Sequence, residues 1–302
     1  SMYSGMTLGG CCRDAMSRTS DFGRPSPFLF RGLLRRPPAA AFIALPGRAP
    51  GKKPPPDPGA DPTDRFDDPV PIGVSVGNEF DCSAGTLGCR VSDGTLQYAL
   101  SNHHVFDPDH NSVIMGERIV QPARLDDPAD NCGGAASENN ILGLVVDSEP
   151  IDFGGVNFID AAITVVPTEL FFGDDPPGCR TLATSTPEGG YGMPKSGLGV
   201  EAVVNQAVQK YGRSTGLTKG QISGLNGTVS VDYLDGTATF QGQILISGRK
   251  FLKPGDSGSL VVTDPDRQPV GLLFAGDRRG SLGIANPILP VLTRFNVVID
   301  GE

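Results

Sequence analysis

The feature of this 302-residue sequence that most limits its fold is a succession of short β-forming runs from Pro71 onward, separated by Gly, Asp, Asn and Pro. Residues 72–77 are typical, because apolar and small residues alternate there as they do in a half-buried strand. The other runs are 86–91, 95–100, 113–120, 141–146, 161–166, 199–211, 220–222, 227–233, 237–247, 258–263 and 269–275. With 41 glycines, 27 prolines and no tryptophan, the pattern predicts many turns and an all-β class.

The runs fall into two sets of similar length, separated by a Pro/Gly-rich stretch over residues 168–197. We therefore expect one β unit over 70–170, a connection over 171–197 and a second β unit over 198–302. Near the end of the chain, Asn286 and Pro287 precede an apolar run. Asn suits the N-cap and Pro the first helical position, which predicts a short C-terminal helix.

Residues 1–69 differ in composition from the rest of the chain and form a Pro-rich, basic N-terminal extension. The first 60 residues hold ten of the 27 prolines and nine Lys and Arg against three acids. Such a segment is typical of a linker, an extended arm or a pro-segment. Residues 35–45 are similar to a secretory signal, but their apolar part is short and starts after two prolines. The sequence therefore favours a cytoplasmic location slightly over a secreted one.

Charge and hydropathy exclude two classes of partner. The net charge is −9, whereas nucleic acids and anionic membranes bind clustered Lys and Arg, so we expect no nucleic-acid partner. No apolar run is long enough for a membrane span. The six cysteines include no C-x-x-C pair, so a zinc ribbon is not indicated. Cys132 and Cys179 lie in loop-like sequence and could form a disulfide, but all six cysteines could equally be free thiols.

The sequence Gly255-Asp256-Ser257-Gly258 places a serine in a glycine-rich bend. A serine hydroxyl attacks a carbonyl only with a base to take its proton and donors to hold the developing oxyanion. The base can come from His103 or His104, which follow a predicted strand. Asp160 stands between Phe-Ile and an apolar strand, so its carboxylate needs a buried partner such as a histidine N–H. Taken singly, the three features could be a surface turn, a solvated histidine and a strand-capping aspartate.

The order His, Asp, Ser accompanies double β-barrels, and Ser259 stands where a Gly-x-Ser-x-Gly elbow would need glycine. An α/β-hydrolase is therefore rejected. The sequence resembles the chymotrypsin-fold (trypsin-like) serine proteases, in particular the bacterial trypsin-like peptidase group. The resemblance covers about residues 70–298 and rests on three blocks: Leu100-Ser101-Asn102-His103-His104-Val105, Asp160-Ala161-Ala162-Ile163 and Gly255-Asp256-Ser257-Gly258-Ser259. It implies two six-stranded antiparallel β-barrels followed by the C-terminal helix.

The resemblance also implies roles for individual residues. His104, which precedes Val105, matches the family's general base, while His103 replaces an asparagine of the usual L-S-N-N-H-V block. Asp160 would orient His104, and Ser257 would attack the scissile carbonyl. The backbone N–H groups of Gly255 and Ser257 would form the oxyanion hole. Asp256 is expected to hold the loop with a partner that the sequence does not reveal, and the stretch 210–218 to form a structural hairpin.

Substrate binding is expected at Phe251, Leu252, Phe274, Ala275 and Gly276. The residue six positions before Ser257 is Phe251 rather than an acid, so the resemblance implies cleavage after an apolar or small residue and not after Lys or Arg. Residues 274–276 would pair with an extended peptide as an added β-strand. Core packing explains Phe251 and Phe274 equally well.

The sequence thus predicts a serine endopeptidase that acts on proteins or peptides without a cofactor. A catalytically silent binding or scaffold module, an enzyme held latent by residues 1–69 and control by a regulatory partner protein remain alternatives. Residues 107–112 space oxygen ligands like the start of a calcium loop, but they lack its glycine, and Arg118 occupies the position of the closing Glu. We therefore expect no metal site.

Overall fold

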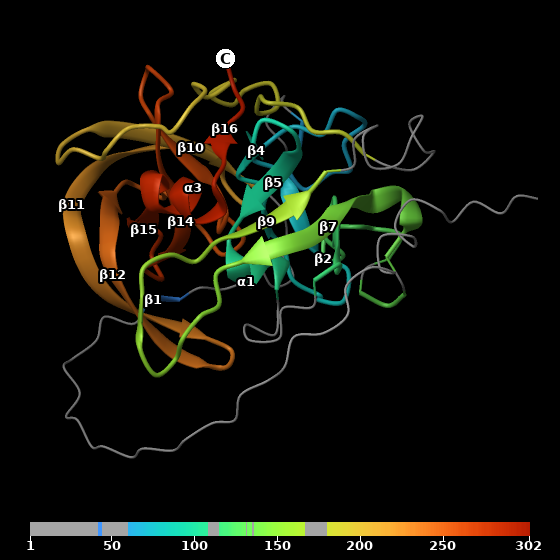
Figure 1. Cartoon of the computed structure of the whole chain (residues 1–302), viewed down its shortest axis with the longest axis horizontal. Helices are drawn as coiled ribbons and strands as arrows, with labels where there is room; N and C mark the ends of the chain where they lie inside the picture. The colour runs from blue at the N-terminus through green and yellow to red at the C-terminus, as the bar shows by residue number, and fades with distance from the viewer. Residues whose placement is uncertain (1–41, 44–59, 108–114, 131, 135, 167–179) are drawn as a thin grey trace, which may run out of the picture.

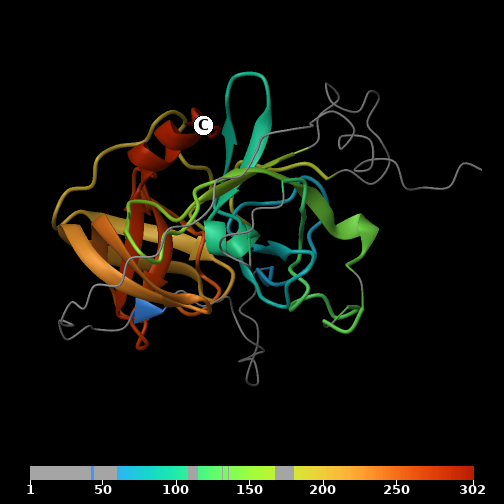
Figure 2. The same cartoon turned by 60° about the horizontal axis from the view of Figure 1, so that its bottom comes forward.

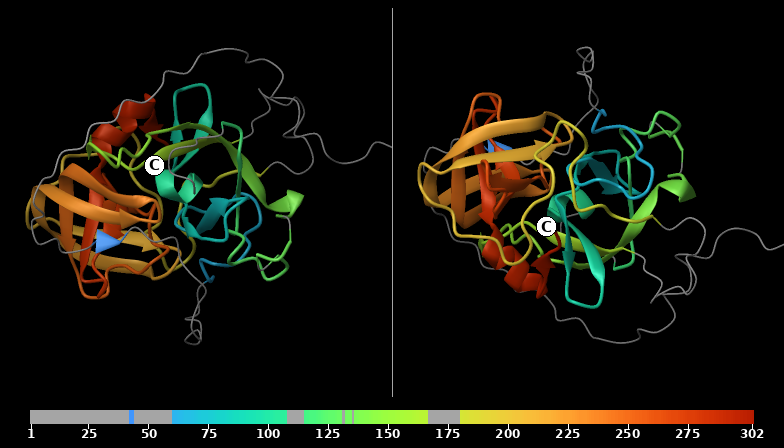
Figure 3. Two further views of the ribbon diagram at one scale, coloured as in Figure 1. Left: turned by 90° about the horizontal axis from the view of Figure 1, so that it is seen from below. Right: turned by 90° about the horizontal axis from the view of Figure 1, so that it is seen from above.

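The computed structural model describes residues 42–43, 60–107, 115–130, 132–134, 136–166 and 180–302. Most of the regular structure is β, arranged in two sheets that lie beside each other (Figures 1 and 3). The two sheets and the short C-terminal helix confirm the predicted all-β class and the chymotrypsin-like double barrel. Among the described residues, no helix is long and apolar enough to cross a membrane.

The first sheet carries the predicted histidine at the end of one of its central strands. Its strand order is β16 (Val298–Ile299), β4 (Cys89–Ser92), β5 (Gln97–Ser101), β9 (Ala162–Val165), β7 (Ile141–Ser148), β6 (Arg118–Val120), β2 (Ser75–Asn78) and β3 (Gly85–Thr86). A single helical turn, α1 (His103–Phe106), follows β5, and a 3₁₀ turn (Glu138–Asn140) precedes β7.

The second sheet is closed into a six-stranded barrel. Its order is β1 (Phe42–Ile43), β11 (Gly216–Tyr233), β10 (Ala207–Gly212), β13 (Leu260–Thr263), β14 (Pro269–Gly276), β15 (Leu282–Pro287), β12 (Gly236–Ser247) and β8 (Val156–Asn157). Because β11 also pairs with β12, the strands β10 to β15 form a ring, to which β1 and β8 are added. The predicted hairpin over 210–218 is the turn between β10 and β11.

The two halves of the chain exchange strands. β8, which precedes β9 in sequence, pairs with β12 of the second sheet, whereas the C-terminal β16 returns to β4 of the first. Leu100 of β5, Leu272 of β14 and Val291 of the helix α3 (Ile288–Phe295) belong to one buried apolar cluster between the barrels. The barrels therefore share a core, and this shared core fixes the loops that emerge between them.

Three details differ from the sequence-based expectation. The strands β1, β8, β15 and β16 were not predicted, and the runs 220–222 and 227–233 are parts of one long strand, β11. The N-cap of α3 is Pro287 rather than Asn286. Asn286 is the penultimate residue of β15, and its amide bonds to the backbone of Asp160 instead of capping the helix. A tertiary contact has thus overridden a local capping preference.

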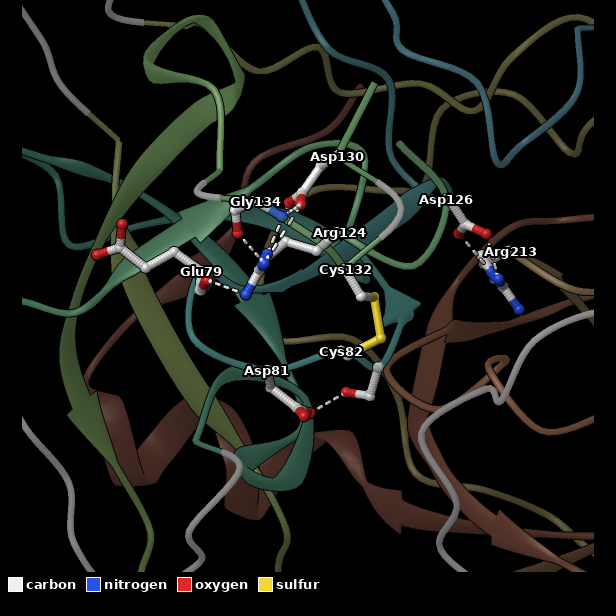
Figure 4. The surroundings of a disulfide bond; sticks show 10 residues. Glu79, Asp81, Cys82, Arg124, Asp126, Asp130, Cys132, Gly134 and Arg213 are labelled. Carbon is white, nitrogen blue, oxygen red and sulfur yellow. Dashed lines mark hydrogen bonds and ion pairs between the residues drawn. A yellow bond between two sulfur atoms is a disulfide. The ribbon is translucent and has the colours of Figure 1, made fainter. Parts of the chain in front are cut away.

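A disulfide joins Cys82 to Cys132, with a sequence separation of 50 (Figure 4). The suggested pairing of Cys132 with Cys179 is therefore wrong, as is the alternative of six free thiols. Cys132 and Cys179 both lie in loop-like sequence, but this local pattern could not show that the fold brings Cys82 close to Cys132. Cys89 is a buried free thiol, and burial raises its pKa. Cys11, Cys12 and Cys179 lie outside the described residues.

Candidate active site

His104 is held against Asp160 at the boundary of the two barrels. β5 ends at Ser101, and the single turn α1 then directs the His104 side chain inward, where it is buried. Its Nδ1 lies 2.6 Å from Asp160 Oδ2, and its backbone N–H donates to Asp160 Oδ1 at 3.3 Å. The adjacent His103 is directed elsewhere, with Nε2 3.7 Å from Asp107 Oδ2. Of the two candidate bases, the fold brings His104 to the acid.

Asp160 is fully buried in the short connection between β8 and β9. The Tyr233 hydroxyl donates to its Oδ2 at 2.8 Å, and the amides of Asn102 and Asn286 donate to its backbone carbonyl at 2.7 and 3.0 Å. Burial raises the pKa of this carboxyl, but the charge and hydrogen bond of His104, with smaller help from His103 and Tyr233, lower the pKa below its ordinary value. The carboxylate is therefore held ionised beside the imidazole.

Ser257 lies on the loop between β12 and β13 and is tied directly to the first barrel. The Thr86 N–H donates to the Ser257 carbonyl at 2.8 Å, and Ser101, the last residue of β5, donates through Oγ to the Thr86 carbonyl at 2.8 Å. These bonds join the serine loop to the strand that leads into His104. The Ser257 hydroxyl donates to the Phe274 carbonyl at 3.1 Å, while His104 Nε2 is buried and, within the described chain, has no hydrogen-bond partner.

The loop before Ser257 leaves two backbone donors available. The Asp256 N–H bonds the Lys253 carbonyl at 3.0 Å and closes a turn in which Gly255 has a φ of 95°, a value suited to glycine. The Pro254 carbonyl accepts from Ser214 Oγ at 2.7 Å, and the Asp256 carbonyl accepts from Ser259 Oγ at 2.6 Å.

In a trans peptide the carbonyl and the following N–H point in opposite directions. The Gly255 and Ser257 N–H groups consequently point away from Ser214 and Ser259. Neither N–H donates a hydrogen bond to any part of the chain that the structure describes. The described part of the fold therefore leaves both donors predicted for the oxyanion hole unused.

The partner of Asp256 is Lys210, on β10. Their charged groups lie 3.1 Å apart, and both side chains are fully buried. Asp256 also accepts the N–H groups of Ser214 and Lys253 at 2.9 and 2.8 Å and the hydroxyl of Thr215 at 2.8 Å. Burial lowers the pKa of Lys210, an effect that the Asp256 charge opposes. This buried pair fixes the turn that presents the two free amides.

The five residues expected to bind substrate have different surroundings. Phe251 is fully buried in the core cluster of the second barrel, so core packing describes it better than a pocket role. Leu252 reaches over Gly276: a Cβ added to Gly276 would lie 2.4 Å from Leu252 Cδ1. Phe274 packs on Phe240 with ring centroids 4.9 Å apart. Ala275 is buried beside it, near the end of β14.

Four residues at the site were missed from the sequence: Asn102, Lys210, Tyr233 and Asn286. Each contacts the site from a strand or turn far from its partner in sequence, with no local pattern to mark it. Asn102 stood inside a block that resembles the proteases, and Lys210 opened the stretch 210–218, for which only a structural hairpin was expected. Asp107 is described, but residues 108–112 of the suggested calcium loop lie outside the described residues. Among those described, no cluster of three or more His, Cys, Asp and Glu side chains could hold a metal.

No family model and no curated protein matches the sequence. Among solved structures, Thermobifida fusca protease A is 20% identical with a TM-score of 0.52, and the match covers 77% of this chain and 99% of that one. A Cellulomonas bogoriensis chymotrypsin is 20% identical with a TM-score of 0.51, over 78% of this chain and 100% of that one. A glutamic acid-specific serine protease is 18% identical with a TM-score of 0.51, over 76% of this chain and 100% of that one.

At these identities the similarity concerns the fold. The chain has the chymotrypsin-like fold of trypsin-like serine proteases, as the sequence blocks predicted.

Proposed function

We propose that the protein is a serine endopeptidase in which His104, Asp160 and Ser257 form the catalytic triad. The observation that carries the proposal is the buried hydrogen bond of 2.6 Å between His104 and Asp160, next to a serine loop with two unused amide donors. His104 Nδ1 bonded to Asp160 leaves Nε2 as the atom able to take a proton. The chemistry of these groups requires no cofactor or metal.

In the proposed reaction, the Ser257 hydroxyl turns from the Phe274 carbonyl toward His104 Nε2 and attacks the substrate carbonyl. His104 takes the hydroxyl proton and then gives it to the leaving amine. Asp160, held ionised, stabilises the imidazolium that forms between these steps. The N–H groups of Gly255 and Ser257 bind the oxyanion. One such donor typically raises the rate of the chemical step about 100- to 1,000-fold. Water then hydrolyses the acyl-enzyme.

A fluorophosphonate probe, which reacts with activated serines, tests this proposal. We expect it to label the intact protein at neutral pH and not to label Ser257→Ala. Ser223→Ala, which changes an exposed serine of β11, is the matched control and should label like the unchanged protein. Unchanged labelling of Ser257→Ala would exclude Ser257 as the nucleophile.

The Leu252 side chain supports a preference for a small residue before the scissile bond. It lies against Gly276, another of the expected substrate-binding residues, so a large substrate side chain beside Gly276 would have to displace it. Peptide-library cleavage should therefore occur mainly after small residues, and Leu252→Ala should admit larger apolar ones. Cleavage confined to Lys or Arg would contradict this preference.

The alternative function is a silent binding or scaffold module. It is favoured by one observation, the direction of the Ser257 hydroxyl toward Phe274 rather than toward His104. Absence of fluorophosphonate labelling over the range from pH 6 to pH 9, in all variants described here, would support this alternative.

A further inference from the structure

A short piece of the N-terminal extension is built into the second barrel. Strand β1, Phe42–Ile43, is separated by more than 160 residues of sequence from the strands it joins. It pairs in parallel with β11, Phe42 opposite Val231 and Ile43 opposite Asp232, and antiparallel with β14, Ile43 opposite Gly276. Figures 1 and 2 show it as the short blue arrow beside the strands of this barrel.

Both strands that receive β1 lead directly to the candidate active site. Gly276 of β14 lies two residues after Phe274, and the Phe274 carbonyl accepts a hydrogen bond from the Ser257 hydroxyl. On the other side, Asp232 is followed by Tyr233, whose hydroxyl bonds Asp160. β1 therefore lies between the strand next to the nucleophile and the strand next to the acid.

The same edge is where a substrate would bind. An extended peptide adds to an exposed sheet edge through its backbone, and the segment 274–276 is the edge expected to receive it. Because Ile43 is paired with Gly276, a substrate strand cannot use that residue while β1 is in place.

We propose that Phe42–Ile43 is a built-in competitor that occupies the peptide-binding edge and keeps the enzyme in a closed, self-inhibited state. This inference rests on the proposed peptidase function and specifies which part of the extension produces latency. A tethered segment acts at an effective concentration on the order of millimolar. Even a weak intrinsic affinity of about 100 µM would then lower activity at low substrate concentration about tenfold.

The test compares Ile43→Pro with the unchanged full-length protein. Proline has no backbone N–H, so at position 43 it cannot donate a hydrogen bond to a neighbouring strand, and β1 has neighbouring strands on both sides. We expect a five- to tenfold lower KM for a peptide substrate and little change in kcat, because the competitor is removed without touching catalytic groups. Ser20→Pro places the same change elsewhere in the extension and should behave like the unchanged protein. Equal KM values for Ile43→Pro and the unchanged protein would overturn the proposal.

A binding measurement keeps the proposal testable if no variant has activity. A fluorescent peptide with the sequence of residues 38–47 is added to proteins that also carry Ser257→Ala. It should bind when Ile43→Pro has vacated the edge and bind at least fivefold more weakly when the native β1 is present. Equal affinity in the two backgrounds, or no binding to either, contradicts self-occupancy. Failure of the peptidase proposal is recognised separately, by the absence of fluorophosphonate labelling in Ile43→Pro itself.

Discussion

At the scale of single residues, the candidate site depends on buried charges whose partners come from several strands. Asp160 bonds His104 and Tyr233 through its carboxylate, and Asp256 bonds Lys210. A buried charge is stable only when it is paired and hydrogen-bonded, so removing one partner leaves a large desolvation penalty.

Tyr233→Phe should make the protein lose stability at a higher pH as acid is added. The Tyr233 hydrogen bond helps to lower the pKa of Asp160, so its removal raises that pKa and the carboxylate is lost earlier as pH falls. For the same reason the stability that Asp160 contributes, present above its unfolded pKa of about 4, disappears at a higher pH as acid is added. The measurement is the free energy of urea unfolding against pH.

Tyr98→Phe is the matched control for this variant, because Tyr98 donates to Asp93 at 2.8 Å on the surface, away from the site. An unchanged pH dependence of the unfolding free energy in Tyr233→Phe would show that the hydroxyl does not influence the acid.

Lys210→Met should destabilise the protein by about 3–5 kcal/mol, the usual effect of breaking a buried ion pair. It should also lower kcat, because Asp256 then no longer holds the turn that presents the Gly255 N–H. Lys219→Met removes a largely exposed lysine that pairs with Asp264 and should cost less than about 1 kcal/mol. Urea unfolding and labelling rates measure the two effects. Similar results for both lysines would mean that burial of the Lys210 pair is unimportant.

At the scale of elements, the loops of the first barrel are held by a covalent bond and a charged clamp. Cys82–Cys132 closes one loop, and beside it Arg124 bonds Asp130 at 2.6 Å and the Glu79 carbonyl at 3.2 Å (Figure 4). Disulfides of this kind persist in oxidising compartments and are rare where thiols are kept reduced.

Replacing both cysteines, Cys82→Ala with Cys132→Ala, should cost about 4 kcal/mol, as expected for a closed loop of about 50 residues. Thermal unfolding with and without dithiothreitol measures this loss. The reductant should lower the melting temperature of the unchanged protein and of Cys89→Ala, whose thiol is free. It should have no effect on the double variant. Equal melting temperatures for the unchanged and double variants would show that the disulfide does not contribute.

At the scale of the whole molecule, two arginines join the barrels in different environments. Arg213, after β10, bonds both carboxylate oxygens of Asp126 of the first barrel, and both side chains are nearly buried (Figure 4). Arg294 of α3 bonds Asp147 of β7 at 2.9 Å and Glu149 at 2.5 Å, in a more exposed place. The two arginines form a natural comparison of buried and exposed bridges between the same bodies.

Arg213→Gln should therefore destabilise the protein by about 3 kcal/mol or more, whereas Arg294→Gln should cost less than about 1 kcal/mol in moderate salt. Arg213 Nη1 also bonds Ser214 Oγ at 3.1 Å, which in turn bonds Pro254 of the serine loop. Labelling of Ser257 should consequently slow in Arg213→Gln and not in Arg294→Gln. Denaturation and labelling together check both statements, and a larger effect of Arg294→Gln on either would contradict them.

The β class, the short C-terminal helix and the three blocks that hold His104, Asp160 and Ser257 could all be predicted from the sequence. These features are local, since alternation, turn residues and short motifs are read within a few neighbouring positions. Other contacts could be recognised only in the folded chain: Lys210 faces Asp256, Tyr233 and Asn286 bond Asp160, Cys82 joins Cys132 and Phe42–Ile43 lies beside Gly276. Those contacts join residues 46 to 233 positions apart, and closure of the barrels brings them together without leaving a local pattern in the sequence.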